Sequence, residues 1–150
     1  MLFSCLFNEI SAQKITLETL IQIDKKNSEE INVLLKSKAP FKWQFQSSKG
    51  DSTYNSSNKD KWSYNWSYRT SISKIVSGND SGCVILETYN PDIMKSVGMN
   101  IKQFKMKEIE QGYYQGQNYV VIVNESITGL GMNWTFTLVE KELFYKSVNR

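Results

Sequence analysis

The spacing of apolar residues near the start of the chain predicts two short helices. Leu17, Leu20 and Ile21 recur at helical spacing after Thr16, which is a good N-cap residue. A second apolar stripe, over residues 31–35, follows Ser28, and we expect that serine to cap the second helix. The Ala39–Pro40 step should end this helical region.

Alternating apolar and polar residues then predict three strands. They are expected at about 41–45, 62–69 and 83–89. A polar stretch at 46–61 reads as a long loop between the first two of these strands.

The second half repeats this order. Asn90-Pro91-Asp92 is typical of a helix start, with Asn as the cap and Pro at the first helical position. Three further strands are expected at about 104–111, 118–127 and 132–140, and the tail 141–150 should dock as a short terminal element.

This order predicts an α+β fold, with an antiparallel sheet and helices packed on one face. The 150 residues suit one domain at 14–150. The echo of Phe41-Lys42-Trp43 in Phe104-Lys105-Met106 suggests a tandem αβββ–αβββ duplication, with halves 14–90 and 91–150, although a chance echo would look the same. Such a layout is similar to the β-lactamase inhibitory protein fold, and this analogy transfers no function.

The most distinctive segment is the second expected strand. Trp62, Tyr64, Trp66 and Tyr68 share one face, and the opposite face is polar. This aromatic face is either the core side of the sheet or an exposed recognition surface, because Trp and Tyr are common in binding hot spots. With Tyr54 in the polar loop, these four residues form the candidate binding surface.

Composition excludes several chemistries. The chain has no histidine, so no mechanism that needs an imidazole is available, and its two cysteines cannot form a four-thiolate zinc site. We therefore expect no cofactor and no metal. Eighteen basic against fifteen acidic residues give a net charge of only +3, with scattered lysines, so a nucleic-acid partner is not expected. No apolar run approaches a membrane span.

The first residues suggest export. Met1–Phe7 is apolar and is followed by Ile10-Ser11-Ala12-Gln13, as at the end of a signal peptide. We interpret residues 1–13 as a signal remnant whose start lies upstream of Met1, with cleavage after Ala12. The protein would then be periplasmic or secreted, and Cys83 would be the single remaining, buried thiol. The alternative is a first strand or helix of a cytoplasmic protein.

Paired carboxylates are the best candidates for catalysis. Glu108 and Glu110 would share one strand face, as would Glu140 and Glu142, and such pairs hydrolyse glycosides when suitably spaced. A lysine beside each pair, Lys107 or Lys141, favours a solvated sheet edge instead.

Five segments together resemble small exported proteins of Bacteroidetes that have no assigned function. They are the signal-like ending Ile10–Gln13, the run Ile15–Ile21, the link Leu35–Lys38 into Phe41–Phe45, the strand Tyr64–Tyr68 and the pre-helix Thr88–Asp92. The resemblance implies export and an α+β fold, and it carries over no catalytic residues.

These observations favour an exported, non-enzymatic binding module, of the inhibitor or immunity type, that acts through contacts with a protein partner. The alternative is a small secreted hydrolase that depends on carboxylates.

Overall fold

The structure is a computed structural model of the chain, and it describes residues 15–38, 43–48, 60–66, 69–77 and 82–149. The apolar residues 1–7 and the proposed cleavage position lie outside the described residues.

The described part of the chain contains four helices, and three of them begin at a side-chain N-cap. They are α2 (Leu17–Asp24), α3 (Ser28–Lys38), α4 (Pro91–Gln103) and α5 (Lys141–Val148). None of them has the length and apolar character needed to cross a membrane.

The helix caps follow local hydrogen bonding. The Thr16 hydroxyl accepts from the Thr19 amide, and the Thr19 hydroxyl accepts from the Thr16 amide, so a reciprocal box starts α2 as expected. Asn90 caps α4 through a bond from the Asp92 amide. The expected cap of α3 is wrong by one residue, because the Asn27 side chain accepts from the Glu30 amide at 2.9 Å and Ser28 is already helical.

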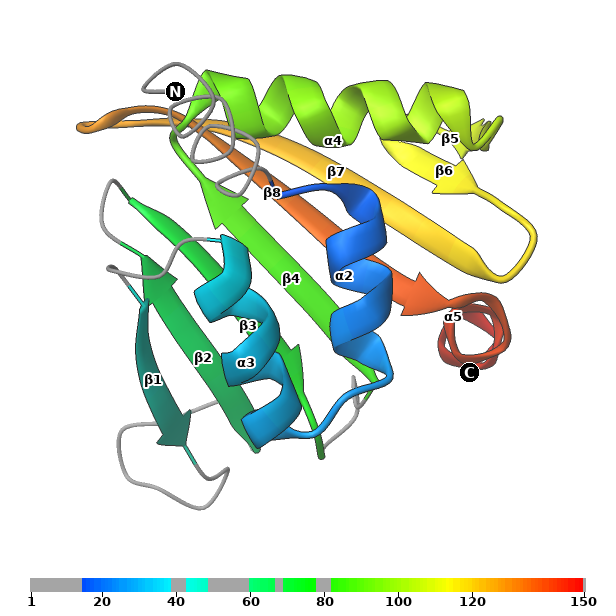
Figure 1. The fold of residues 1–150 in the computed structure, drawn as a ribbon. Helices are drawn as coiled ribbons and strands as arrows, with labels where there is room; N and C mark the ends of the chain where they lie inside the picture. Colours follow the sequence, from blue (N-terminus) through cyan, green and yellow to red (C-terminus); the bar gives the residue numbers. More distant parts are fainter. Residues whose placement is uncertain (1–14, 39–42, 49–59, 67–68, 78–81, 150) are drawn as a thin grey trace, which may run out of the picture.

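Eight strands form one antiparallel sheet with the order β1-β2-β3-β4-β8-β7-β6-β5 (Figure 1). The strands are β1 (Trp43–Ser48), β2 (Lys61–Trp66), β3 (Thr70–Ile75), β4 (Cys83–Thr88), β5 (Lys107–Glu110), β6 (Tyr113–Gln115), β7 (Tyr119–Thr128) and β8 (Gly131–Glu140). The two four-strand meanders meet where β4 pairs with β8.

The α+β class and the antiparallel sheet are therefore confirmed, and each half of the chain contributes four described strands to the sheet rather than three. Sequence reasoning missed β3, a Ser-rich strand with few apolar residues, and β6, which has only three residues. A helix precedes each meander, α3 before β1 and α4 before β5, so the two halves keep the same order of elements.

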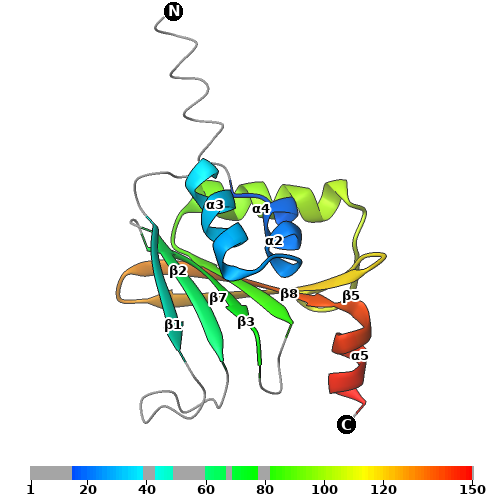
Figure 2. The same cartoon turned by 60° about the horizontal axis from the view of Figure 1, so that its bottom comes forward.

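Helices α2, α3 and α4 cover one face of the sheet (Figure 2). Helix α5 lies on the opposite side of the sheet. There the centroids of the Phe144 and Tyr113 rings are 6.0 Å apart. Tyr113 points away from the other helices because its neighbour Tyr114 pairs with the helix-facing Val121.

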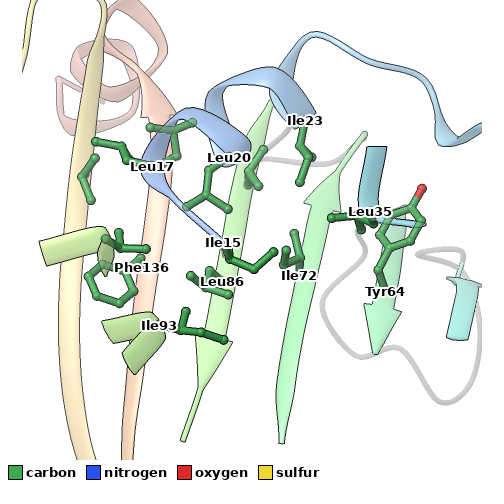
Figure 3. Packing of buried hydrophobic residues seen from close by; sticks show 14 of the residues in the cluster. Ile15, Leu17, Leu20, Ile23, Leu35, Tyr64, Ile72, Leu86, Ile93 and Phe136 are labelled. Carbon is green, nitrogen blue, oxygen red and sulfur yellow. The ribbon is translucent and has the colours of Figure 1, made fainter. Parts of the chain in front are cut away.

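The main core lies between the sheet and the three helices on its covered face (Figure 3). Leu20 and Ile23 of α2 pack above Ile72 of β3 and Leu86 of β4. Ile93 of α4 is also part of this core, so one continuous cluster joins both halves of the chain.

Candidate functional site

The aromatic strand has its helix-facing side in the core. Tyr64 is fully buried, and its hydroxyl donates to the Ser28 carbonyl at the start of α3, at 3.1 Å. Burial raises the pKa of Tyr64 to about 12. Tyr64 therefore anchors α3 to β2 and is not part of an exposed surface.

Trp62 lies on the same face, two residues before Tyr64, and is half-buried against the core. Lys74, its cross-strand partner on β3, places its ammonium 5.9 Å from the centre of the Trp62 ring. This cation–π contact occupies the ring from the side of β3.

The predicted aromatic binding surface was therefore wrong for Tyr64, because three helices cover this side of the sheet. The backbone of Trp66 ends β2, opposite Thr70 and Trp43, and its side chain lies outside the described part. Tyr54 and Tyr68 also lie outside the described residues, so their role stays a prediction.

Neither expected carboxylate pair forms on a strand face. Glu108 pairs with Tyr114 and Glu110 pairs with Tyr113, so a bulge between them turns the two side chains to opposite faces. The second pair is separated by a change of element, because β8 ends at Glu140 and α5 begins at Lys141.

A different acidic group gathers at the C-terminus of α2. The Tyr119 hydroxyl donates to Asp24 Oδ2 at 3.2 Å, and Glu140 is the cross-strand partner of Tyr119. Burial and the Glu140 charge raise the pKa of the Asp24 carboxyl. Burial, with the nearby Asp24 charge, raises the pKa of Tyr119 to about 12.

A hollow of about 690 Å³ opens beside this group, lined by Tyr119, Glu140, Gln117, Asn118 and Lys25 among others. Tyr119 and Glu140 line this hollow, whereas Asp24 is not among its lining residues. Sequence reasoning missed Asp24, because this residue approaches Tyr119 only through the packing of α2 on the sheet.

The end of the β7–β8 hairpin projects as a two-stranded ribbon beyond the rest of the sheet (Figure 1). β6 pairs with β7 only as far as Ile122, and β4 pairs with β8 only from Trp134 onward. Residues 125–133 therefore have no other strand beside them among those described. Such a ribbon is marginally stable alone.

Polar contacts from neighbouring segments hold this ribbon in place. Arg69 Nη1 donates to the Leu130 carbonyl at 3.0 Å, and the Thr128 hydroxyl donates to the Tyr89 hydroxyl at 3.4 Å. On the side away from α4, Asn133 Nδ2 donates to Glu87 Oε1 at 2.9 Å. These three bonds fix the ribbon without covering its apolar side chains.

Three apolar side chains at this end are exposed, and we call them the hairpin tip: Ile127, Leu130 and Met132. Ile127 is 83% exposed, Leu130 58% and Met132 37%, and Ile127 and Met132 form a cross-strand pair. Adjacent exposed apolar residues of this kind usually mark an interaction surface.

Sequence reasoning placed Met132 in an alternating strand but missed the tip. The signal was present in Ile127-Thr128-Gly129-Leu130-Gly131-Met132, because apolar residues continue into a glycine-rich turn where polar ones are usual. The sequence could not show that the hairpin outruns its neighbouring strands.

Within the described ranges, no group of three or more Cys, Asp or Glu side chains is arranged to hold a metal ion. A scan against models of protein families finds no match, and searches of curated proteins and of solved structures find no similar chain. The resemblance to exported proteins of Bacteroidetes therefore stays a prediction.

Proposed function

We propose that the protein is a non-enzymatic binding module of the inhibitor or immunity type, and that the hairpin tip is its main contact with a protein partner. The observation that carries the proposal is the exposed cross-strand pair of Ile127 and Met132, with Leu130 at the turn. A contact centred on such side chains gains stability by removing apolar area from water.

The tethers of the ribbon support this role. The bonds from Arg69 to Leu130 and from Thr128 to Tyr89 fix the backbone before a partner arrives. Less conformational entropy is then lost on binding.

A charge substitution at the tip tests the proposal. Ile127→Asp should leave the free energy of unfolding within about 0.5 kcal/mol of wild type, because the side chain is exposed. It should abolish the capture of the partner that wild-type protein captures in its own host. Val33→Asp is the matched control. Val33 is also an exposed apolar residue, at 69%, but it belongs to helix α3 and not to the hairpin tip. Equal capture by wild type and by Ile127→Asp would refute the proposal.

We further propose that the protein acts after export, in the periplasm or outside the cell. The support is the Ile10-Ser11-Ala12-Gln13 pattern after a short apolar run. Export would also place the buried Cys83 thiol in an oxidising compartment, where its burial limits its reactivity.

A carboxylate-dependent hydrolase is the second candidate, and the raised pKa of Asp24 beside Glu140 favours it. A panel of nitrophenyl glycosides assayed with wild type, Asp24→Asn and Glu140→Gln would test this candidate. Turnover that both variants lose would favour the hydrolase over the binding module.

A further inference from the structure

Within the described ranges, three helices are too few to cover the helix-facing side of eight strands. Neighbouring strands lie about 4.8 Å apart, so a helix about 10 Å wide covers roughly two of them. Along the outer flank of α4, the side chains of Tyr114, Val123 and Trp134 are packed against the core and still half-exposed. The described residues therefore leave the sheet incompletely covered on this side.

A groove of about 380 Å³ runs between α4 and these strands. Its walls are largely apolar: Met94 and Ile101 from α4, with Val123, Trp134 and Phe136 from the sheet. This volume lies within the range of about 300–1,000 Å³ usual for small-molecule sites.

Gly98 keeps the α4 wall of the groove open. It lies in the middle of the helix, where glycine costs about 1 kcal/mol relative to alanine. A Cβ atom built there meets nothing within 4 Å, so packing does not require the glycine. Because Gly98 lines the groove, a longer side chain at this position would extend into it.

The charges along the groove give it a polarity. Lys95 and Lys102 line it from α4, about 10 Å apart along the helix axis. Glu125 is its acidic lining residue, on the part of β7 nearer the hairpin tip. That end is also where α4 begins, since Tyr89, just before the helix, contacts Thr128. Glu125 therefore lies toward Lys95, and none of the acidic residues that line the groove lies beside Lys102.

The other end of the groove holds Lys102 and Tyr114. Glu108 is the cross-strand partner of Tyr114, but its carboxylate accepts from the Gly112 amide at 3.2 Å and it does not line the groove. An anionic group at this end would meet the Lys102 ammonium and the Tyr114 hydroxyl.

We propose that this groove binds a single-chain anionic amphiphile of the fatty-acid type. The carboxylate lies at Lys102, and the alkyl chain runs along Val123 toward Trp134 and Met94. Charge complementarity at one end and apolar walls along the rest select this class of ligand over neutral sugars, nucleotides and cationic amphiphiles. The proposal is independent of the hairpin tip and its partner.

Dodecanoate is the probe, and dodecyltrimethylammonium is the charge-reversed control. Both are used with the full-length protein at concentrations below their critical micelle concentrations. We expect saturable 1:1 binding of dodecanoate by calorimetry, with a shift of the Trp134 indole N–H signal, and at least tenfold weaker binding of the cation. Absence of saturable dodecanoate binding, or equal binding of both probes, would overturn the proposal.

Two variants locate the site. Gly98→Leu should weaken dodecanoate binding at least tenfold by filling the groove, and Lys102→Gln should weaken it several-fold. Gly129→Leu is the matched control, because Gly129 also has open space around its Cβ position and lies in the hairpin turn. If Gly98→Leu fails to fold, Met94→Glu places a repelling carboxylate in the same groove. Unchanged binding in the folded groove variant would refute the assignment.

Discussion

Lys74 closes the C-terminus of helix α2 from the neighbouring sheet, with its Nζ 2.7 Å from the carbonyl oxygen of Asp24. The same ammonium donates to the Ile23 carbonyl at 3.2 Å and to the Lys26 carbonyl at 2.8 Å. It adds hydrogen bonds to carbonyls at the C-terminal end of the helix, where the Ile23 carbonyl also accepts from the Lys26 amide, and a cation is favourable at that end of the helix dipole. Burial lowers the pKa of Lys74, and the Asp24 charge opposes this shift.

Lys74→Met should therefore destabilise the fold by about 1.5–3 kcal/mol, the usual range for hydrogen bonds to a charged group. Urea titration of the free energy of unfolding measures the change. Lys107→Met, on the exposed strand β5, is the control and should change stability by less than about 0.5 kcal/mol. If Lys74→Met lowers the free energy of unfolding by less than about 0.5 kcal/mol, water replaces the ammonium at these carbonyls without a loss of stability.

The buried Tyr64 gives a second prediction. Tyr64→Ala should cost about 3–5 kcal/mol, as for other large aromatic truncations in a core, and Tyr64→Phe about 1 kcal/mol through the lost bond to the Ser28 carbonyl. Phe104→Ala, at a position 52% exposed, is the control for removing an aromatic ring. If Tyr64→Ala lowers the free energy of unfolding no more than Phe104→Ala does, this face of β2 is exposed and is not part of the core.

Asp24 predicts a pH dependence of stability. Its pKa in the folded protein is raised by burial and by Glu140, so the folded state holds this proton more strongly than the unfolded state. The stabilising contribution is complete below the ordinary Asp pKa of about 3.9 and is lost as pH rises through the folded-state value. The stability of Asp24→Asn relative to wild type should therefore increase as pH is raised from that region toward neutrality.

Urea titrations of both proteins across that pH range measure the difference. Asp92→Asn, at the exposed start of α4, is the control for the loss of one carboxyl group elsewhere on the protein. A difference between Asp24→Asn and wild type that is constant with pH would contradict the raised pKa.

The alternation and capping signals were sufficient for most of the fold. Thr16 and Asn90 cap the helices expected at their positions, and β7 and β8 lie close to the predicted 118–127 and 132–140. Each of these features is decided within one turn or one strand, where local hydrogen bonding and apolar periodicity act. β3 failed this test because Ser71 and Ser73 weaken its apolar signal.

The functional surfaces depended on tertiary packing and escaped the sequence. The aromatic alternation in β2 could not show which face the helices would cover, and α3 covers the face of Tyr64. The carboxylate pair on β5 failed because a bulge reverses one side chain. The hairpin tip exists because β7 and β8 are longer than their neighbours, and strand length relative to a neighbour is a property of the assembled sheet.

Export predicts a defined mature N-terminus. Mass spectrometry of the protein produced in its own host from the full precursor should find a chain that starts at or near Gln13. Replacing Ala12 by a bulky residue should slow this processing, because signal-peptide cleavage sites require small residues. A mature protein that retains Met1 to Ala12 would end the export argument.

Binding through the hairpin tip is the central claim, and photocrosslinking tests it most directly. A photoreactive amino acid in place of Leu130 should give one discrete adduct with a different protein in the host, and the same group in place of Val33 should give none. Both positions are exposed, Leu130 at 58% and Val33 at 69%. A difference in crosslinking therefore reflects where the photoreactive group lies and not how accessible it is. Identical products from the two positions, or no product from position 130, would contradict the claim.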